Sequence, residues 1–422
     1  MNFTTEAAFA KKMDAHDELA AFRRRFVIAE PDLIYLDGNS LGRQPQGSIP
    51  LLQEIISAQW GSRLIRGWNE GWMALPEQIG GKIARLLGAD ADEVIIADST
   101  SVNLFKLALA AVQAQPDRHK IITDDLNFPS DLYILQGVAR LVARPLHIQV
   151  IPSPDGIHGP VDALAAAIDA DTALVTLSHT VFKSAYTYDL TAVTQLAHRS
   201  GALMLWDMSH SAGSVPIDLH QANADLAVGC TYKYLNGGPG SPAFLYIRRD
   251  QQARLGNPIT GWMGQQHMFD FALTYERDPG LRHFLTGTPP ILSIAAIEPG
   301  IDLLLEAGMA SLRAKSVQQT EYLIYLYEQW LEPQGFRLNS PREATWRGSH
   351  VSLGHKDGWR IDQALIQDMH VIPDFRQPDN IRLGIAPLYT SYYDIYEAMR
   401  RLRLVMDRRL YEKYEEGTTA VT

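Results

Sequence analysis

Two segments of the sequence carry an acid and a lysine whose chemistry could be combined in one site. The first is the apolar run 203–207, which ends in Asp207. The second, 224–240, leads into Tyr232 and Lys233 and continues as the turn-rich Asn-Gly-Gly-Pro-Gly. Short apolar runs of this kind are typical of buried parallel strands. A lysine that can form a Schiff base with an aldehyde, and a carboxylate that can pair with a pyridinium nitrogen, are what a pyridoxal phosphate enzyme requires.

A simpler interpretation needs no chemistry: Asp207 would cap a turn, and Lys233 would be a solvated surface side chain. The spacing between the two residues would by itself favour that simpler interpretation. The apolar residues that flank both segments, the adjacent Tyr232 and the glycine-rich turn favour a catalytic role instead.

The elements that must position these residues alternate between strand and helix. Apolar runs bounded by turn residues predict strands at 93–97, 120–123, 147–151, 173–177, 203–207, 224–228 and 243–247. Apolar residues at helical spacing lie between several of these strands. Such alternation predicts the α/β class, with a mostly parallel sheet covered by helices on both faces.

Polar side chains gather where the predicted strands end. They are Asp98–Ser101, Asn127–Asp131, Ser178, Asp207–His210 and Thr231–Lys233. Ligands on sheets of this class lie at the carboxyl ends of the strands. We therefore expect all five groups to line one site.

Five short motifs lie along the chain, and their combination is specific although each alone would be weak. They are Tyr35-Leu-Asp-Gly-Asn-Ser-Leu-Gly42, Asn127-Phe-Pro-Ser-Asp131, Trp206-Asp-Met-Ser-His210, Cys230-Thr-Tyr-Lys-Tyr-Leu-Asn-Gly-Gly-Pro-Gly240 and Gly261-Trp-Met-Gly264. Together they resemble kynureninases, the pyridoxal phosphate-dependent hydrolases of the fold type I, aminotransferase-like group. The resemblance runs from about Tyr35 to Tyr396.

This resemblance implies a large domain, whose mostly parallel sheet is flanked by helices, and a smaller α+β domain. The expected bounds are 1–60 for an N-terminal arm and part of the small domain, 61–300 for the large pyridoxal phosphate-binding domain, and 301–422 for the C-terminal small domain. The pattern changes near Pro290, beyond which an amphipathic helix at 309–331 is followed by fewer strands.

The resemblance also implies how the cofactor is held. Thr100 and Ser101 open a helix, where N–H groups and hydroxyls suit a phosphate, although an ordinary helix cap uses the same residue types. His210 is expected to touch the phosphate or orient Asp207, whereas the residues alone favour a structural histidine. The full cofactor set is Thr100, Ser101, Phe128, Ser130, Asp131, Ser178, Asp207, His210, Tyr232, Lys233, Trp262 and Thr288, with Trp262 and Thr288 supplied by the neighbouring subunit of a homodimer.

Two further residues are expected to contact the substrate. Arg382 lies in the apolar segment 381–389, and a buried arginine is costly unless it is paired. A substrate α-carboxylate would pair it bidentately, or an acid elsewhere in the chain would form a buried salt bridge with it. Trp68 resembles an aromatic pocket residue of bacterial kynureninases, with core packing as the alternative role.

By this resemblance the chain is expected to hydrolyse L-kynurenine, or its 3-hydroxy form, to anthranilate, or 3-hydroxyanthranilate, and L-alanine. The reaction belongs to tryptophan catabolism and to the kynurenine pathway toward NAD. Lys233, Tyr232 and Asp207 would be catalytic, and no metal is expected. The alternatives are a cysteine desulfurase or aminotransferase of the same fold group, or a non-catalytic binding protein with this fold. A desulfurase needs a mobile cysteine, whereas Cys230 is expected to be held at a strand end.

Composition narrows the class of protein further. The formal net charge of −10 argues against nucleic acid as a partner. The single cysteine excludes a disulfide framework within the chain and fits a reducing compartment. The first residues lack the pattern of a signal peptide, and no apolar run approaches membrane-spanning length. We expect a cytoplasmic enzyme that acts on a small molecule.

Overall fold

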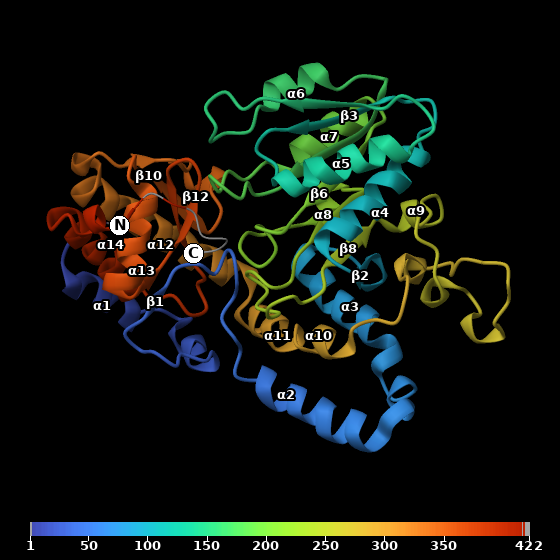
Figure 1. Cartoon of the computed structure of the whole chain (residues 1–422), viewed down its shortest axis with the longest axis horizontal. Helices are drawn as coiled ribbons and strands as arrows, with labels where there is room; N and C mark the ends of the chain where they lie inside the picture. Colours follow the sequence, from blue (N-terminus) through green and yellow to red (C-terminus); the bar gives the residue numbers. More distant parts are fainter. Residues whose placement is uncertain (1, 416, 418–422) are drawn as a thin grey trace.

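The computed structural model describes residues 2–415 and 417, and its main element is a seven-stranded sheet (Figure 1). The strand order is β2-β8-β7-β6-β5-β3-β4. The strands are β2 (Val94–Ile96), β3 (Lys120–Asp124), β4 (His147–Ile151), β5 (Thr172–Ser178), β6 (Leu203–Asp207), β7 (Leu226–Gly229) and β8 (Phe244–Ile247). Strands β3 to β7 run parallel, while β8 is antiparallel to both β7 and β2. The predicted α/β class with a mostly parallel sheet is confirmed.

Alternate residues of the buried strands face helices on opposite sides of this sheet. Met204 and Trp206 of β6 pack in one hydrophobic core, and Leu203 and Leu205 of the same strand pack in another. The first core includes the helices α3 (Leu75–Leu87), α6 (Val161–Ala167) and α7 (Leu190–Arg199), and the second core includes α4 (Thr100–Gln113) and α5 (Pro129–Leu141). The sheet is thus covered on both faces, which leaves its strand ends as the place for a ligand.

Helix α3 was not among the predicted elements, because its Gly80-Gly81 pair disfavours a helix. The structure gives a reason for the glycine: a Cβ on Gly80 would lie 2.2 Å from the carbonyl oxygen of Val94. The helix packs directly against β2, and its Ile79 and Ile83 side chains are fully buried. Packing therefore outweighs the low helix propensity of this segment.

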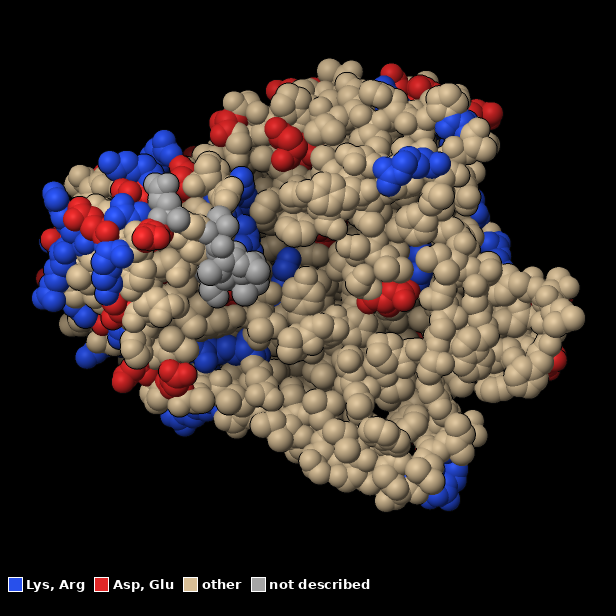
Figure 2. All heavy atoms as spheres, viewed as in Figure 1, with Lys and Arg blue, Asp and Glu red and all other residues tan. Residues whose placement is uncertain are grey.

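The C-terminal residues form a second unit around a four-stranded antiparallel sheet with the order β12-β13-β10-β9. Its elements are α12 (Met309–Trp330), β9 (Arg337–Leu338), β10 (His350–Gly354), α13 (Gly358–Met369), β12 (Asp374–Arg376), β13 (Asn380–Gly384) and α14 (Tyr392–Asp407). The N-terminal helix α1 (Ala7–Ala15) packs on α14, and β1 (Ile34–Tyr35) pairs with β11 (Val371–Ile372). The two units meet at a hollow that is bordered by Lys and Arg side chains (Figure 2).

Residues 48–74 form a helical arm that projects from the body and is drawn in blue in Figure 1. Helix α2 (Ser48–Glu54) continues into a π-helical segment, Ile55–Arg63, and then into 3-10 turns at Leu64–Trp68 and Trp72–Ala74. Exposed apolar side chains on the arm are Ile49, Ile56, Trp60, Leu64 and Ile65. Across the part of the chain that is described, no helix has the length and apolar character needed to cross a membrane.

Candidate active site

The carboxyl ends of β5 and β6 place two predicted residues side by side. Ser178 ends β5 and lies opposite Asp207, which ends β6. Asp207 is 6% exposed, and one of its oxygens accepts hydrogen bonds from the backbone N–H (2.8 Å) and the hydroxyl (2.6 Å) of Ser209. Burial raises the pKa of Asp207, while the Ser209 hydroxyl and the charge of Lys233 oppose this rise. The carboxylate is therefore held in one orientation near the lysine.

Lys233 follows β7, and its amino group contacts His210. The Nζ atom lies 2.8 Å from Nε2 of His210, on the loop that follows Asp207. Burial lowers the pKa of His210 well below its usual value, and the charge of Lys233 is the second cause. The imidazole is therefore neutral, and Lys233 donates the hydrogen bond to it.

The loop 37–42 packs against the turn that carries Lys233. The backbone N–H of Gly42 donates to the carbonyl of Tyr232 at 2.8 Å. A Cβ on Gly42 would lie 2.3 Å from the carbonyl oxygen of Lys233, so glycine is needed for this approach. Two motifs that are far apart in the sequence thus form one structure around the lysine.

Cys230 and Tyr232 are two further functional groups at the end of β7. Cys230 is buried, and its Sγ donates to the backbone carbonyl of Ser209 at 3.7 Å. The sulfur is therefore held in place at the strand end. The Cys230 side chain, together with burial, raises the pKa of Tyr232, so this phenol keeps its proton at neutral pH.

Two helix starts meet beside this cluster and offer groups that suit a phosphate. Ser99 caps α4, because its hydroxyl accepts from the N–H of Val102 at 3.4 Å, and Thr100 and Ser101 form the first turn. The Ser101 hydroxyl lies 3.1 Å from that of Ser130, in the first turn of α5. The N–H groups at the start of α4 and these hydroxyls form a suitable anion site.

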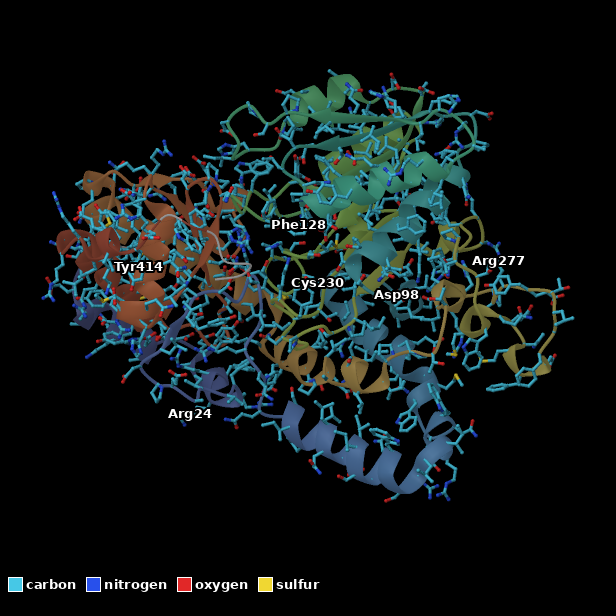
Figure 3. All side chains as sticks on the ribbon, in the orientation of Figure 1. Arg24, Asp98, Phe128, Cys230, Arg277 and Tyr414 are labelled. Carbon is cyan, nitrogen blue, oxygen red and sulfur yellow. The ribbon has the colours of Figure 1, made fainter. Side chains whose placement is uncertain are left out.

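Asp131 and Phe128 indicate that a ligand completes the site. Asp131 is 4% exposed, and its Oδ2 has no hydrogen-bond partner among the described residues. Burial raises the pKa of Asp131 well above its usual value, the charge of Asp207 adds to the rise, and Lys233 opposes it. Phe128, which is labelled in Figure 3, is 46% exposed. Its ring packs edge-to-face on Phe182 at a centroid distance of 5.2 Å. An unpaired buried carboxyl oxygen and an exposed aromatic ring fit a polar aromatic cofactor.

Arg382 is fully buried, and the structure identifies an acid that pairs with it. It lies on β13 opposite Asp374 of β12, with which it forms an ion pair. Its guanidinium also donates to the carbonyl of Phe182 (2.6 Å) and to the hydroxyl of Ser40 (3.0 Å). Burial lowers the pKa of Arg382 to about 10, so the side chain is charged at neutral pH. The buried salt bridge that the sequence left open is present, and it uses only part of the five N–H donors.

Asp374, Arg376 and Ser40 were not among the predicted site residues. The Ser40 hydroxyl donates to Asp374 at 2.9 Å, and Arg376 forms an ion pair with the same carboxylate at 2.6 Å. The sequence carried a signal for this pairing, because the turn residues 377–379 separate two short segments that can form a hairpin. Such a hairpin places Asp374 opposite Arg382.

Three predicted residues lie apart from this cluster. Trp262 is 43% exposed, and Thr288 is exposed as well. Trp68 is half-buried on the projecting arm, where its ring packs edge-to-face on Trp72 at a centroid distance of 5.7 Å. Within the described chain, none of the three has a hydrogen bond or ring contact with the Lys233 cluster. The chain by itself thus assembles only part of the predicted site.

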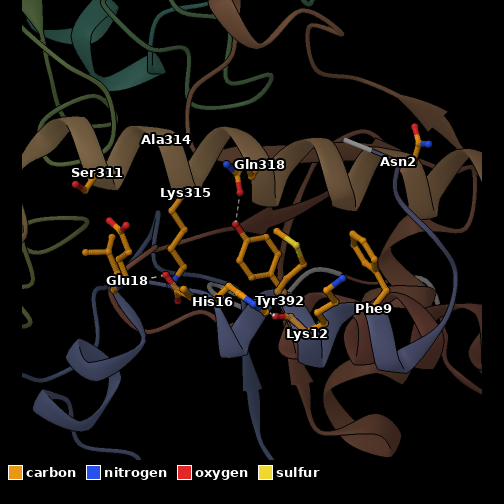
Figure 4. A pocket seen from close by; sticks show the side chains of 13 residues that line it. Asn2, Phe9, Lys12, His16, Glu18, Ser311, Ala314, Lys315, Gln318 and Tyr392 are labelled. Atoms are coloured by element: carbon orange, nitrogen blue, oxygen red, sulfur yellow. Dashed lines mark hydrogen bonds and ion pairs between the residues drawn. The ribbon is translucent and has the colours of Figure 1, made fainter.

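A cavity between α1 and α12 contains none of the predicted site residues (Figure 4). Its volume is about 650 Å³, and an ion pair between Lys315 and Asp17 (2.6 Å) lies at its wall. Lys315 also donates to the carbonyl of Pro387 at 2.5 Å, and the Tyr392 hydroxyl donates to Gln318 at 3.0 Å. Because these polar groups already have protein partners, they give no indication of a ligand.

Solved structures share the fold at low sequence identity. The cysteine desulfurase from Thermococcus onnurineus NA1 superposes with a TM-score of 0.79 at 17% identity, over 92% of this chain and 98% of that chain. The desulfurase CsdA from Escherichia coli gives a TM-score of 0.75 at 18% identity, over 93% and 98%. At these identities the likeness shows the fold type I architecture and not the desulfurase activity.

Sequence comparison identifies the family. Residues 312–402 match the family model of the kynureninase C-terminal domain. The chain is 44% identical over 402 residues to kynureninase from Pseudomonas fluorescens, with 94% of each chain covered. It is 42% identical over 422 residues to kynureninase from Burkholderia mallei (strain SAVP1), with 99% of each chain covered. Identity of this extent over nearly the whole length, in a chain whose strand-end cluster fits pyridoxal phosphate, shows that the chain belongs to the kynureninase family.

Proposed function

We propose that this chain hydrolyses the Cβ–Cγ bond of L-kynurenine, or of its 3-hydroxy form, to L-alanine and anthranilate, or 3-hydroxyanthranilate. The observation that carries the proposal is the cluster of buried Asp207 and Asp131 with the half-buried Lys233 at the strand ends of a chain with full-length kynureninase relatives. The reaction places the chain in tryptophan catabolism. The fold neighbours are desulfurases, but Cys230 is buried and hydrogen-bonded, which argues against a sulfur nucleophile.

Pyridoxal phosphate, when bound, supplies an electron sink for bonds to the α- and β-carbons of the substrate. Thr100 and Ser101 are proposed to hold its phosphate at the start of α4, together with Tyr232, since helix N-termini bind anions. Phe128, with its exposed ring, is proposed to stack on the pyridine ring. The remaining wall is assigned to Ser130, Asp131, Ser178 and His210.

Three residues are proposed to hold or move protons. Lys233 takes the proton from the substrate α-carbon through Nζ, the atom that His210 orients. Tyr232 keeps its phenolic proton at neutral pH and can therefore donate at the carbonyl oxygen of the substrate. Asp207, which Ser209 fixes, accepts from the protonated ring nitrogen.

Arg382 is proposed to bind the α-carboxylate of the substrate. Asp374 and Ser40 hold one side of its guanidinium, so the fork is oriented before the substrate arrives. A charge-assisted bidentate pair then fixes the Cα–H bond relative to the cofactor ring. Trp68 is proposed to contact the aromatic ring of the substrate.

We also propose a homodimer whose subunits complete one another's sites. Apolar side chains are exposed on the helical arm 48–74 and on a second surface, whose members are Ile259, Trp262, Phe269, Phe271, Leu273 and Tyr275. On the arm Ile65 is 77% exposed, and Leu273 on the second surface is fully exposed, which is unusual for a monomer. Contact between two copies would cover both surfaces. In that assembly Trp262 and Thr288 are proposed to reach the partner's cofactor.

The domain bounds 1–60, 61–300 and 301–422 are proposed on the grouping of buried side chains. Ala10, Ile34 and Leu36 belong to the same hydrophobic core as residues of α12, α13 and α14, which supports joining the N-terminal arm to the small domain. Leu19 and Phe26 pack instead in a core of the large sheet. A cytoplasmic location is proposed as well, since Cys230 is a free thiol.

The test is a fluorescence assay for anthranilate with the cofactor-loaded protein, using L-kynurenine and 3-hydroxy-L-kynurenine in parallel. We expect at least one substrate to be cleaved, with L-alanine released in equal amount. The Lys233→Ala protein serves as the control for background hydrolysis. If wild-type protein cleaves neither substrate, the proposed function fails.

A further inference from the structure

His350 is a fully buried histidine beside the catalytic cluster, and the mechanism above does not use it. It begins β10 and lies opposite Gly384 of β13, in the hairpin that also carries Arg382. Its side chain is 0% exposed. The ring centroids of His350 and His210 are 5.8 Å apart, with an interplanar angle of 61°. His350 therefore lies next to the imidazole that contacts Lys233.

The contacts of His210 determine which of its nitrogens carries the proton. Nε2 receives the hydrogen bond from Nζ of Lys233 at 2.8 Å. A neutral imidazole has one donor and one acceptor nitrogen, so Nδ1 of His210 is the N–H donor. This buried Nδ1 has no hydrogen-bond partner among the described residues. Buried donors are rarely left unpaired, so a group beside Nδ1 is expected to accept.

Both ring nitrogens of His350 also lack a hydrogen-bond partner in the described part of the chain. The carbonyls of Phe182 and Lys183 oppose the lowering of the pKa of His350, and each keeps a second lone pair beside its bond from Arg382 or Ser352. One of them can therefore accept from the N–H of a neutral His350, which leaves the other ring nitrogen as an acceptor. No direct hydrogen bond joins the two imidazoles among the described residues, and with ring centroids 5.8 Å apart a single water can bridge them. Buried waters occupy polar sites of this kind, between groups that have no other partner.

The charges that surround the two rings are cationic. Lys233, on the loop after β7, and Arg382, on β13, act on both rings, and Arg376, on β12, acts on His210. Burial, followed by these cations, lowers the pKa of both histidines well below the usual value. Both rings are therefore neutral at physiological pH. A neutral His350 offers one acceptor nitrogen to a bridging water.

We propose that His350 is a positioning residue that holds His210 in its Nδ1–H tautomer through one buried water. The water accepts from Nδ1–H of His210 and donates to a nitrogen of His350. Nε2 of His210 then stays an acceptor for the free amino group of Lys233, which keeps Nζ oriented. The catalytic consequence rests on the proposed function, whereas the tautomer follows from the contacts alone.

Nitrogen NMR of the full-length protein before cofactor loading, labelled with ¹⁵N-histidine, reads the tautomer while Lys233 carries its free amino group and without any measurement of activity. The signals of His210 are assigned by their loss in a His210→Gln protein. We expect Nδ1 to be protonated in the wild type and in His350→Gln, whose amide can still accept from the water. His350→Phe keeps a ring but offers no acceptor, so Nδ1 protonation should give way to an Nε2–H or mixed tautomer. An unchanged His210 tautomer in folded His350→Phe would overturn the proposal.

His355 provides the matched control, because it is a 5% exposed histidine just beyond the same strand whose ring contacts Phe336. His355→Phe should leave the His210 signals unchanged, and an equal change there would show that any disturbance of the strand is sufficient.

Kinetics give the second readout. His350→Phe should lower kcat about fivefold, which is the effect of losing one neutral hydrogen bond, with KM within twofold. His350→Gln should stay close to wild type. A lower melting temperature with unaltered tautomer and kcat would mean that His350 is only structural. If the wild type cleaves no kynurenine, the proposed function fails while the NMR result still decides the tautomer.

Discussion

Replacing Arg382 by lysine separates a role in substrate binding from a role in the salt bridge with Asp374. Lysine keeps the positive charge, but it lacks the planar fork that binds a carboxylate bidentately. Among the described residues the guanidinium has three partners, namely the Asp374 carboxylate, the carbonyl of Phe182 and the hydroxyl of Ser40. Lysine can keep the ion pair but not all of these contacts. Both stability and kinetics should therefore respond, by different amounts.

The expected magnitudes follow from the lost contacts. Losing two hydrogen bonds of about 1 kcal/mol each should lower the free energy of unfolding by about 2 kcal/mol. Losing the bidentate pair with the substrate carboxylate should cost on the order of 3 kcal/mol in transition-state binding, or about a hundredfold in kcat/KM. Cofactor binding should be unchanged, because Arg382 is assigned no contact with the cofactor.

The assay is initial-rate fluorescence of the anthranilate product, normalised to the amount of folded, cofactor-loaded protein. Arg347→Lys is a matched control, because Arg347 is also a fully buried arginine of the C-terminal unit. It forms an ion pair with Glu321 at 2.5 Å and donates to the carbonyls of Pro341 and Arg342, both at 2.7 Å. The control should lose similar stability in a denaturant titration while its kcat/KM stays near that of wild type.

One result would refute the reasoning on the substrate carboxylate. If Arg382→Lys unfolds more easily but keeps kcat/KM per folded molecule within about twofold of wild type, Arg382 serves the salt bridge alone. Equal kinetic losses in Arg382→Lys and Arg347→Lys would show that the loss is not specific to the site.

Three further predictions concern the lysine, the subunits and a buried acid. Borohydride reduction followed by peptide mapping should place the pyridoxyl label on Lys233, and a label on Lys106 or Lys183 instead would contradict the assignment. Mixing Trp262→Ala and Lys233→Ala proteins under conditions of subunit exchange should regenerate activity above the sum of the parents, and its absence despite proven exchange would count against a shared site. Burial raises the pKa of Asp362 to about 8, with the charge of Asp37 as the second cause. The folded state thus binds this proton more tightly than the unfolded chain does. The free energy of unfolding therefore falls as the pH rises from about 4 to about 8. Because the pKa rises by about four units, at about 1.4 kcal/mol each, Asp362→Asn should raise the free energy of unfolding at pH 8 by roughly 5 kcal/mol and leave it little changed near pH 4. Denaturant titrations at both pH values measure this, and the same pH dependence in both proteins would refute it.

Much of the sheet was predictable because strand signals are local. The run 203–207 was predicted with the same bounds as β6, and its last residue, Asp207, lies opposite Ser178 at the end of β5. Helix α3 was missed because its glycines are unfavourable in an isolated helix. The requirement for glycine at position 80 comes from its close contact with Val94 of β2, which is a tertiary contact.

Part of the site could also be predicted, because it is built from residues at the ends of these strands. The groups at the strand ends come together because parallel strands end at one edge of the sheet. The partners of Arg382 could not be read from the sequence, since Asp374 reaches it through a hairpin and Phe182 from the other unit. Whether Trp262 and Thr288 reach a site is decided by a second copy of the chain, and their role stays a prediction.

The sequence by itself determined the order of strands and helices, the polar residues at the strand ends and the acid–lysine pair, because periodicity and turn chemistry act over a few neighbouring residues. Only the tertiary structure decided which charges and rings meet. His210 contacts Lys233 and lies beside His350, and Gly42 approaches the lysine turn, through the packing of segments far apart in the chain. The protonation of these groups follows from the same packing, since burial and neighbouring charge set each pKa, and no stretch of sequence contains either quantity.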